Sequence, residues 1–279
     1  MKLNLFHLCA LVAFFSIKPA QNKHTMLFAH GLADTKEQAK LWGPSTDTKK
    51  PHLFDGSIVC RNFLDATTHF WRVNFPWTSL GQDNEIEIIR QAYQEMCLIN
   101  PDQRFIFGGL SRGAAAMLNF LAIDKPQQVD AVVLESPFSS MRDVAQNIVG
   151  SCFLNNIPYV KEISPYLVGL IFWQYSDAGI HPIDVVQNID PNIPIMVISK
   201  KDDYLVPTCI TQHIVDALKA NGHTKIHHLV LNNGKHGKYI LGNEGERMQN
   251  VVHAFYKQYD LPHNELYAAL GRKDFEKTF

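Results

Sequence analysis

Short apolar runs alternate with amphipathic stretches along the chain from residue 24 onward. The apolar runs are rich in β-branched and aromatic side chains, a pattern that is typical of buried β-strands. Turn-forming or polar residues interrupt the pattern between the runs. We therefore expect strands at 26–29, 57–60, 70–75, 104–107, 131–134, 195–198 and 227–231.

Segments of helical length separate several of these strands. Asn84 is a good N-cap residue, and the apolar residues after it recur at spacings of three and four, which predicts a helix. A second helix is expected over 112–121. A third is expected to begin at Pro207 and to end at Asn221-Gly222, since Pro is favoured at the first helical position and Gly just past the last. Strands joined by helices predict a mostly parallel sheet in an α/β fold.

The segment 141–191 departs from this alternation and is too long for one crossover helix. We interpret it as a helical cap inserted into a single domain that extends over 24–279. Within it lies a strongly apolar run, 167–173. That run could line a pocket for an acyl chain, but cap helices need an apolar face simply to pack on the body, and we favour packing.

The first 20 residues form a separate unit. Lys2 precedes an apolar run over 3–17, and polar and small residues follow at 18–20. This order is typical of an export signal, so we expect residues 1–20 to be a signal peptide or a membrane anchor. The protein would then be periplasmic, secreted or membrane-anchored. The alternative is a buried N-terminal element of a cytoplasmic protein.

The composition excludes two classes of partner. The 279 residues are 46% hydrophobic and 19% charged, a balance typical of a globular protein with a large core. The chain has 26 basic and 27 acidic residues, so its net charge of −1 lacks the positive field that nucleic-acid binding requires. No apolar run after the N-terminal segment is long enough to cross a bilayer. We expect no nucleic-acid partner, and membrane contact only through an uncleaved N-terminal segment.

Four cysteines follow the N-terminal segment, and none has the spacing of a zinc site. An even number of cysteines in an exported protein permits disulfides. We favour the interpretation that all four are small buried apolar side chains. They are Cys60, Cys97, Cys152 and Cys209.

The segment 109–113 has the pattern Gly-x-Ser-x-Gly, with Ser111 at its centre. It lies between a predicted strand and a predicted helix, which is where a nucleophile elbow occurs. Such a turn strains the serine backbone and exposes its hydroxyl above the sheet. Glycines at 109 and 113 leave no side chain to strike the neighbouring strand and helix. We predict that Ser111 is a nucleophile, and the alternative is an ordinary glycine-rich turn.

A serine hydroxyl is a weak nucleophile and needs a base that an acid orients. After an elbow of this kind, the acid and then the base follow the serine along the chain. Asp203 comes shortly after the strand 195–198, and His236 after the strand 227–231. Both lie where strands end, the edge at which parallel sheets build their sites. We predict Asp203 as the acid and His236 as the base.

The acid has two alternatives. Asp202 directly precedes Asp203, and Glu135 follows the strand 131–134. Asp203 could also serve only to cap the helix that follows it.

The oxyanion of an acyl-transfer transition state needs backbone N–H donors. One donor is expected from Arg112, directly after the serine. The second is expected from Leu32, in the turn after the first strand, where Gly31 allows the backbone to approach. We expect a structural role for His30.

In these motifs the chain resembles the α/β-hydrolase superfamily, over 24–262. The signatures occur in the order of that superfamily: the oxyanion dipeptide His30-Gly31, the nucleophile motif 109–113, the acid motif 203–207 and the histidine motif 234–237. The string 135–140, Glu-Ser-Pro-Phe-Ser-Ser, is similar to one in the serine-aminopeptidase-like and acyl-thioesterase-like branch.

The resemblance implies an α/β-hydrolase fold, with a mostly parallel central sheet flanked by helices and a small helical cap insertion. It implies Ser111 as nucleophile, Asp203 as acid and His236 as base. It also implies a structural role for Glu135.

Other site motifs are missing from the sequence. There is no glycine-rich nucleotide motif and no His-Glu-x-x-His, and the adjacent His227 and His228 would point to opposite faces of a strand. We therefore expect no cofactor and no metal.

The predicted function is that of a serine hydrolase that cleaves a small acyl substrate, an ester, thioester or amide, through an acyl-enzyme. The alternatives are an acyltransferase with the same triad and a non-catalytic binding protein that retains the fold. The presence of all three triad residues disfavours the second. The sequence leaves the oligomeric state and the identity of the substrate open.

Overall fold

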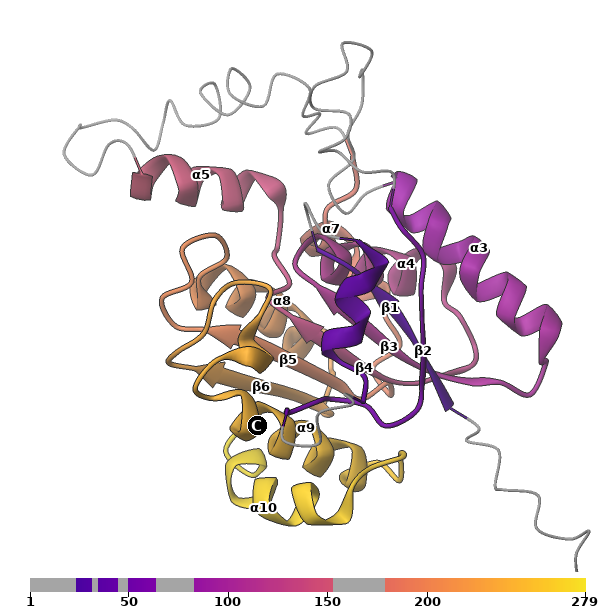
Figure 1. Ribbon diagram of the computed structural model, residues 1–279. Helices are drawn as coiled ribbons and strands as arrows, with labels where there is room; N and C mark the ends of the chain where they lie inside the picture. The colour runs from indigo at the N-terminus through magenta and orange to yellow at the C-terminus, as the bar shows by residue number, and fades with distance from the viewer. Residues whose placement is uncertain (1–23, 32–34, 45–49, 64–82, 153–178) are drawn as a thin grey trace, which may run out of the picture.

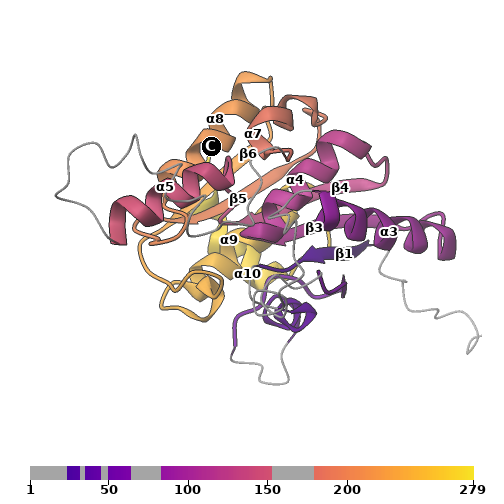
Figure 2. The ribbon, with the colours of Figure 1, turned by 90° about the horizontal axis from the view of Figure 1, so that it is seen from above.

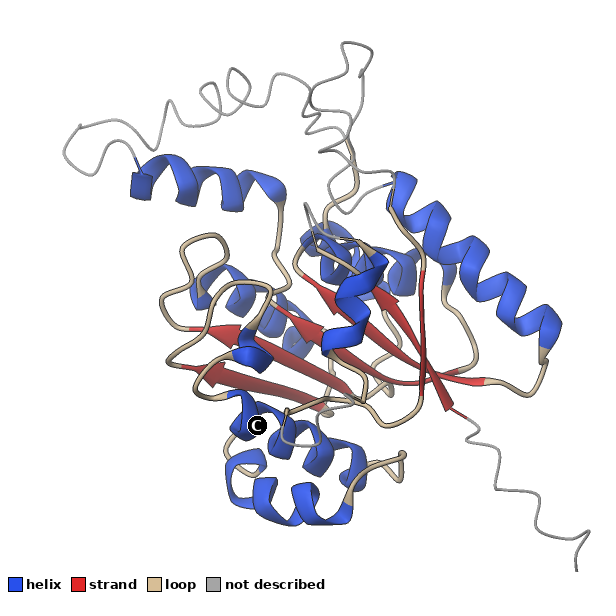
Figure 3. Cartoon of the chain, in the orientation of Figure 1, coloured by secondary structure: helices blue, strands red, loops and turns tan. Residues whose placement is uncertain are grey.

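The computed structural model describes residues 24–31, 35–44, 50–63, 83–152 and 179–279, with the side chains of 149–152 left out. Within these residues, six strands form one sheet, in which they lie in the order β2-β1-β3-β4-β5-β6. Figure 3 shows the sheet among its covering helices. Every neighbouring pair is parallel. The strands are β1 (His24–Ala29), β2 (Ser57–Cys60), β3 (Arg104–Leu110), β4 (Val129–Glu135), β5 (Ile195–Lys200) and β6 (Ile226–Leu231).

Six of the seven predicted strands therefore form, and most of them extend a few residues further than predicted. The expected strand at 70–75 lies outside the described residues. The central strands read as continuous apolar runs because helices cover both faces of a parallel sheet. In β3, for example, all residues after Arg104 are buried.

The described part of the chain contains several helices, most of which pack on the two faces of the sheet. They are α3 (Asp83–Ile99), α4 (Arg112–Asp124), α5 (Met141–Cys152), α7 (Pro182–Val185), α8 (Thr208–Ala220), α9 (Gly245–Gln258) and α10 (Glu265–Phe275), with short 3-10 turns η1 (Lys36–Leu41), η2 (Val186–Asn188) and η3 (Tyr239–Leu241). Figures 1 and 2 show α4, α7 and α8 on one face and α9 and α10 on the other.

The strands alternate their side chains between two apolar cores. In β1, Leu27 packs into the core shared with α3, α4 and α8, whereas Met26 and Phe28 pack into the core shared with η1 and α9. This alternation follows from the period of two in a strand. The result is a three-layer α/β/α arrangement that confirms the predicted fold class.

The helix expected from Pro207 differs from the prediction at its start. Pro207 has an extended backbone and is the N-cap residue, and α8 begins one residue later. The predicted end is confirmed, because Asn221 is the C-cap and Gly222 follows with a φ of 88°. Positive φ is the conformation that glycine adopts without steric cost.

The inserted segment is described only at its two ends. Beyond β4, α5 packs its first turns on a small apolar cluster, in which Met141 and Val144 contact residues of α4 and of α8. Residues 153–178, including the apolar run 167–173, lie outside the described part of the chain. The cap and its boundaries stay a prediction.

Two further expectations concern the N-terminal segment and contact with a membrane. The segment 1–20 lies outside the described residues, so the export signal stays a prediction. Among the described helices, none is long and apolar enough to span a membrane.

The side chains of three of the four cysteines are described, and these three are free thiols. Cys60 and Cys97 are half-buried, but Cys209 is exposed. The expectation that all four are buried is therefore wrong for Cys209, and it holds only in part for Cys60 and Cys97. It lies in the first turn of α8 next to Ile210, and a helix buries only the face on which Ile210 and Ile214 lie.

Candidate active site

Ser111 lies in a strained turn between β3 and α4. Its φ of 51° and ψ of −115° are outside the regions that residues other than glycine usually adopt. Two backbone hydrogen bonds hold the turn: the N–H of Ser111 donates to the Glu135 carbonyl (2.8 Å), and the N–H of Ala115 donates to the Ser111 carbonyl (3.0 Å). The sharp turn from strand to helix is the backbone form of a nucleophile elbow.

The two glycines of the motif are required by close packing. A Cβ at Gly109 would lie 2.8 Å from Cα of Ala114 in the following helix. A Cβ at Gly113 would lie 2.1 Å from the carbonyl oxygen of Ala29 in β1. Both contacts are with backbone atoms, which could move only if the helix or the strand shifted. The predicted reason for glycine at these positions is confirmed.

His236 lies within hydrogen-bond distance of both Ser111 and Asp203. Its Nε2 is 3.1 Å from Oγ of Ser111, and its Nδ1 is 2.8 Å from Oδ2 of Asp203. A carboxylate can only accept, so Nδ1–H donates to Asp203 and Nε2 is left to accept the serine proton. Positive φ angles at Gly234 and Gly237 turn the loop that presents the ring. The three residues predicted from chain order therefore meet at one edge of the sheet.

The Asp203 carboxylate is fully occupied by donors. Oδ1 accepts the N–H groups of Leu205 (2.8 Å) and Val206 (3.0 Å), in addition to the His236 contact at Oδ2. Burial raises the pKa of Asp203, but the hydrogen bond and charge of His236, together with the other donors, outweigh burial and leave the pKa below its ordinary value. Asp203 is therefore ionised at neutral pH and can orient the imidazole.

The structure separates Asp203 from the two alternative acids. Asp202 is exposed. Glu135 is fully buried at the end of β4, and its Oε1 accepts the N–H of Tyr239 (3.4 Å). Burial, with a smaller effect from the Asp203 charge, raises the pKa of Glu135 to about 8. A carboxyl group that keeps its proton at neutral pH is a poor orienter for a histidine base.

Sequence reasoning missed Tyr239. Its phenol hydroxyl donates to Oδ2 of Asp203 and accepts a hydrogen bond from Oγ of Ser136 (2.8 Å). Burial, with the adjacent Asp203 charge, raises the pKa of Tyr239 far above its ordinary value, so the phenol stays protonated. Only its place three residues after His236 marks this tyrosine in the sequence, and no motif predicts the contact.

Gln38 was also missed. Its Oε1 accepts the N–H of Gly31 (2.7 Å), and its Nε2 donates to the carbonyl of Gly237 (3.5 Å). The side chain thus joins the turn after β1 to the loop that carries His236. Gln38 is buried in η1, and a single buried glutamine in so short a 3-10 turn leaves no periodic pattern in the sequence.

His30 holds backbone groups near the same turn. Its Nε2 accepts the N–H of Phe63 (2.9 Å), which places the ring proton on Nδ1, and Nδ1 lies 2.9 Å from the carbonyl of Gly31. Both contacts are with backbone groups and join separate segments of the chain, so His30 has a structural role.

Of the two expected oxyanion donors, Leu32 lies outside the described residues. Arg112 opens α4, and the first N–H groups of a helix have no acceptor within the helix itself. The Arg112 side chain is buried. Its guanidinium lies 3.7 Å from Oε1 of Glu85 and 5.0 Å from the centre of the Phe63 ring.

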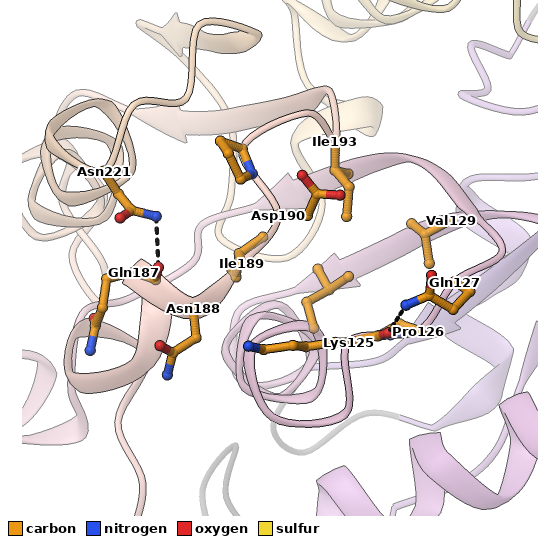
Figure 4. A pocket seen from close by; sticks show the side chains of 12 residues that line it. Lys125, Pro126, Gln127, Val129, Gln187, Asn188, Ile189, Asp190, Ile193 and Asn221 are labelled. Atoms are coloured by element: carbon orange, nitrogen blue, oxygen red, sulfur yellow. Dashed lines mark hydrogen bonds between the residues drawn. The ribbon is translucent and has the colours of Figure 1, made fainter.

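A polar cavity of about 530 Å³ lies away from these residues (Figure 4). Its lining includes Lys125 just after α4, Val129 at the start of β4 and Ile193 just before β5. These are the amino ends of parallel strands, so the cavity is at the edge of the sheet opposite Ser111. It does not belong to the candidate active site.

In the described part of the chain, His52, Asp55 and His253 have the composition of a metal site, with ligand atoms within 4.8 Å of one another. Burial lowers the pKa of His253 to about 4, so its ring is neutral at pH 7. Its Nδ1 accepts the N–H of Asn264 (3.0 Å), which places the single ring proton on Nε2. Since a bound metal needs a nitrogen lone pair, His253 in this tautomer is not a ligand, and we assign no metal site to the cluster.

Comparison with known proteins supports the fold. No family model and no curated protein sequence matches the chain. An esterase from Pyrococcus furiosus matches in structure with a TM-score of 0.61 and 16% identity, covering 85% of this chain and 83% of that one. An acylaminoacyl peptidase from Pyrococcus horikoshii matches with a TM-score of 0.57 and 15% identity. The match covers 90% of this chain but only 39% of the peptidase. These likenesses, with the parallel sheet and the strained serine turn, show that the chain has the α/β-hydrolase fold.

Proposed function

We propose that the protein is a serine hydrolase that cleaves a carboxylic ester, thioester or amide through an acyl-enzyme. One observation carries the proposal: Ser111 Oγ, His236 and Asp203 form a continuous hydrogen-bonded line at a strained strand-to-helix turn. Backbone strain in a residue other than glycine persists where the surrounding structure enforces it, and it is concentrated at functional sites.

Each residue has one role in the proposed reaction. Nε2 of His236 takes the proton of the Ser111 hydroxyl as the oxygen attacks the substrate carbonyl. The ionised Asp203 holds the proton of His236 on Nδ1, so that Nε2 presents its lone pair to the serine. It also stabilises the imidazolium that forms. All three side chains are needed because the hydroxyl alone is a weak nucleophile at neutral pH.

The remaining steps use the same groups. The attack forms a tetrahedral oxyanion, which the N–H groups of Arg112 and Leu32 would bind. His236 then gives its proton to the leaving alcohol, thiol or amine as the carbonyl re-forms, and Ser111 is left acylated. Water then attacks the acyl carbon while His236 takes one of its protons. As the second tetrahedral intermediate collapses, His236 gives that proton to Ser111 Oγ, which releases the acid and the free serine. No step requires a cofactor.

The structural neighbours support this reaction class. The names of the two proteins, an esterase and an acylaminoacyl peptidase, describe cleavage of an ester and of an amide. Ester and amide cleavage are both acyl transfers, which the proposed acyl-enzyme route can perform. The names of the neighbours leave the preferred bond open, so the activity should be assayed on esters, thioesters and amides.

The experiment compares the wild type with Ser111→Ala. We expect a fluorophosphonate probe to label the wild type and not the variant, and hydrolysis of short aryl esters to be lost with the label. Ser57→Ala, at the surface in β2, is the matched control and should keep both. A Ser111→Ala protein that is still labelled and active would refute the proposal. The same panel, extended to aminoacyl amides and to an acceptor alcohol, separates esterase, peptidase and acyltransferase.

A further inference from the structure

Tyr239 contacts the acid of the triad at the same oxygen as the base. Its phenol hydroxyl donates to Oδ2 of Asp203, and Nδ1 of His236 lies 2.8 Å from that oxygen. With the two backbone N–H groups on Oδ1, each carboxylate oxygen has two donors. A carboxylate offers about four lone-pair sites, so the group is held in one plane.

Two consecutive residues at the end of β4 hold Tyr239 in turn. Oγ of Ser136 donates to the phenol oxygen (2.8 Å), and Oε1 of Glu135 accepts the Tyr239 N–H (3.4 Å). All three side chains are fully buried. Tyr239 is thus fixed both at its backbone and at the end of its side chain, by a strand that neighbours the nucleophile strand β3.

Ser136 has an uncommon backbone conformation. Its φ is 51°, which is uncommon for a residue other than glycine, and its N–H donates to the Ile198 carbonyl of β5 (2.7 Å). Ser111, one strand away, has the same φ. Such conformations persist where the surrounding structure enforces them, and they are concentrated at functional sites. The hydroxyl of this residue is the donor to Tyr239.

We propose that Tyr239 is a positioning residue of the triad, through which Ser136 and Glu135 hold the Asp203 carboxylate in the plane that faces His236. The inference rests on the proposed function. Tyr239 is fully buried, so it acts through Asp203 and does not touch substrate. The charged and titratable groups that face it are Asp203, His236 and Glu135, from the loops after β5 and β6 and from β4.

The decisive variant is Tyr239→Phe, which removes one oxygen and keeps the ring. Without the phenol donor, the negative charge of Asp203 is less dispersed, so the carboxylate attracts the protonated His236 more strongly. The carboxylate is also held less firmly in the plane that orients the base. We expect kcat on an aryl ester to fall about tenfold with KM unchanged. We also expect the acid limb of the pH profile of kcat/KM to move up by about 0.5 unit, because the protonated imidazole is better stabilised.

Two further variants make the test specific. Tyr256→Phe is the matched control, since Tyr256 is equally buried and its hydroxyl has no hydrogen-bond partner among the described residues. It should keep the wild-type kcat and pH profile. Ser136→Ala removes the donor to the phenol and should shift the acid limb in the same direction by less. If Tyr239→Phe does not fold, the pH profile of Ser136→Ala tests the positioning role in its place.

The outcomes separate this inference from the proposed function. Loss of labelling in Ser111→Ala, together with a shifted profile in Tyr239→Phe and not in Tyr256→Phe, supports both. Loss of labelling in Ser111→Ala with a wild-type profile in Tyr239→Phe overturns the positioning role alone. A drop in kcat that accompanies lower stability without any shift of the acid limb also overturns it, because a purely structural role predicts that result.

Discussion

Nδ1 of His236 lies 2.8 Å from Oδ2 of Asp203, and the Asp203 side chain is 0% exposed, whereas the neighbouring Asp202 is exposed to solvent. Two aspartates that are adjacent in sequence therefore have opposite environments. The loop after β5 turns Asp203 inward because Oδ1 accepts the N–H groups of Leu205 and Val206. This difference supplies a pair of matched variants.

Asp203→Asn should lower kcat by about a thousandfold or more. The amide cannot replace an ionised carboxylate as partner of Nδ1–H, so the imidazole loses the tautomer that leaves Nε2 free to accept the serine proton. Asp202→Asn should leave kcat near the wild-type value. Steady-state hydrolysis of an aryl ester checks both variants, and equal losses in the two would contradict the assignment of the acid.

Gly113→Ala should destabilise the protein by about 3 kcal/mol or more. The added Cβ would lie 2.1 Å from the Ala29 carbonyl oxygen, so α4 and β1 would have to move apart. Gly222→Ala is the control. Its φ of 88° is strained for alanine, but no atom lies within 4 Å of the added Cβ, and the cost should be about 1 kcal/mol. Urea unfolding followed by circular dichroism measures both.

Glu135→Gln should change how stability depends on pH. Burial raises the pKa of Glu135 from 4.5 to about 8, so the folded protein keeps this proton while the unfolded chain loses it. The free energy of unfolding of the wild type therefore falls as pH rises from 4.5 to 8, by up to about 1.4 kcal/mol per pH unit from this group. Glutamine does not titrate, so the variant escapes this fall.

The measurement is urea unfolding of the wild type and Glu135→Gln at pH 5 and pH 8. The variant should gain stability relative to the wild type between the two pH values. Glu87→Gln is the control, because the pKa of the exposed Glu87 is lowered by its hydrogen bonds to Gln91 and Arg90, and the group is ionised in both states over this range. A constant difference between wild type and Glu135→Gln would show that Glu135 is ionised in the folded protein.

The fold was predictable because its determinants are local. Each of the six described strands contains an apolar run that the sequence marks, and the three predicted helices occur with ends that differ by few residues. Pro207 shows the size of such differences: it caps α8 and does not begin it. Exposure was less predictable. Cys209 is exposed because the orientation of α8 on the sheet, and not the residue type, decides which face is covered.

The candidate site also has a part that the sequence predicts and a part that it does not. Chain order and strand ends were enough to select Ser111, Asp203 and His236, because parallel strands bring their carboxyl ends to one edge. The contacts of Gln38 with Gly31 and Gly237 were not predictable. Such contacts join residues whose separation in sequence carries no periodic signal.

By itself, the sequence determined the sheet-forming runs, the glycine-flanked Ser111 and the order in which an acid and a histidine follow it, because backbone conformation and periodicity are properties of neighbouring residues. The tertiary structure alone decided which carboxyl group faces His236. It also decided that Tyr239 donates to that carboxyl group and that Ser136 donates to Tyr239. Those outcomes depend on burial and on distances between residues that are 33 and 103 positions apart in the chain. Only the packed sheet brings such residues together, and only in its low-dielectric interior do Asp203 and Glu135 acquire opposite protonation.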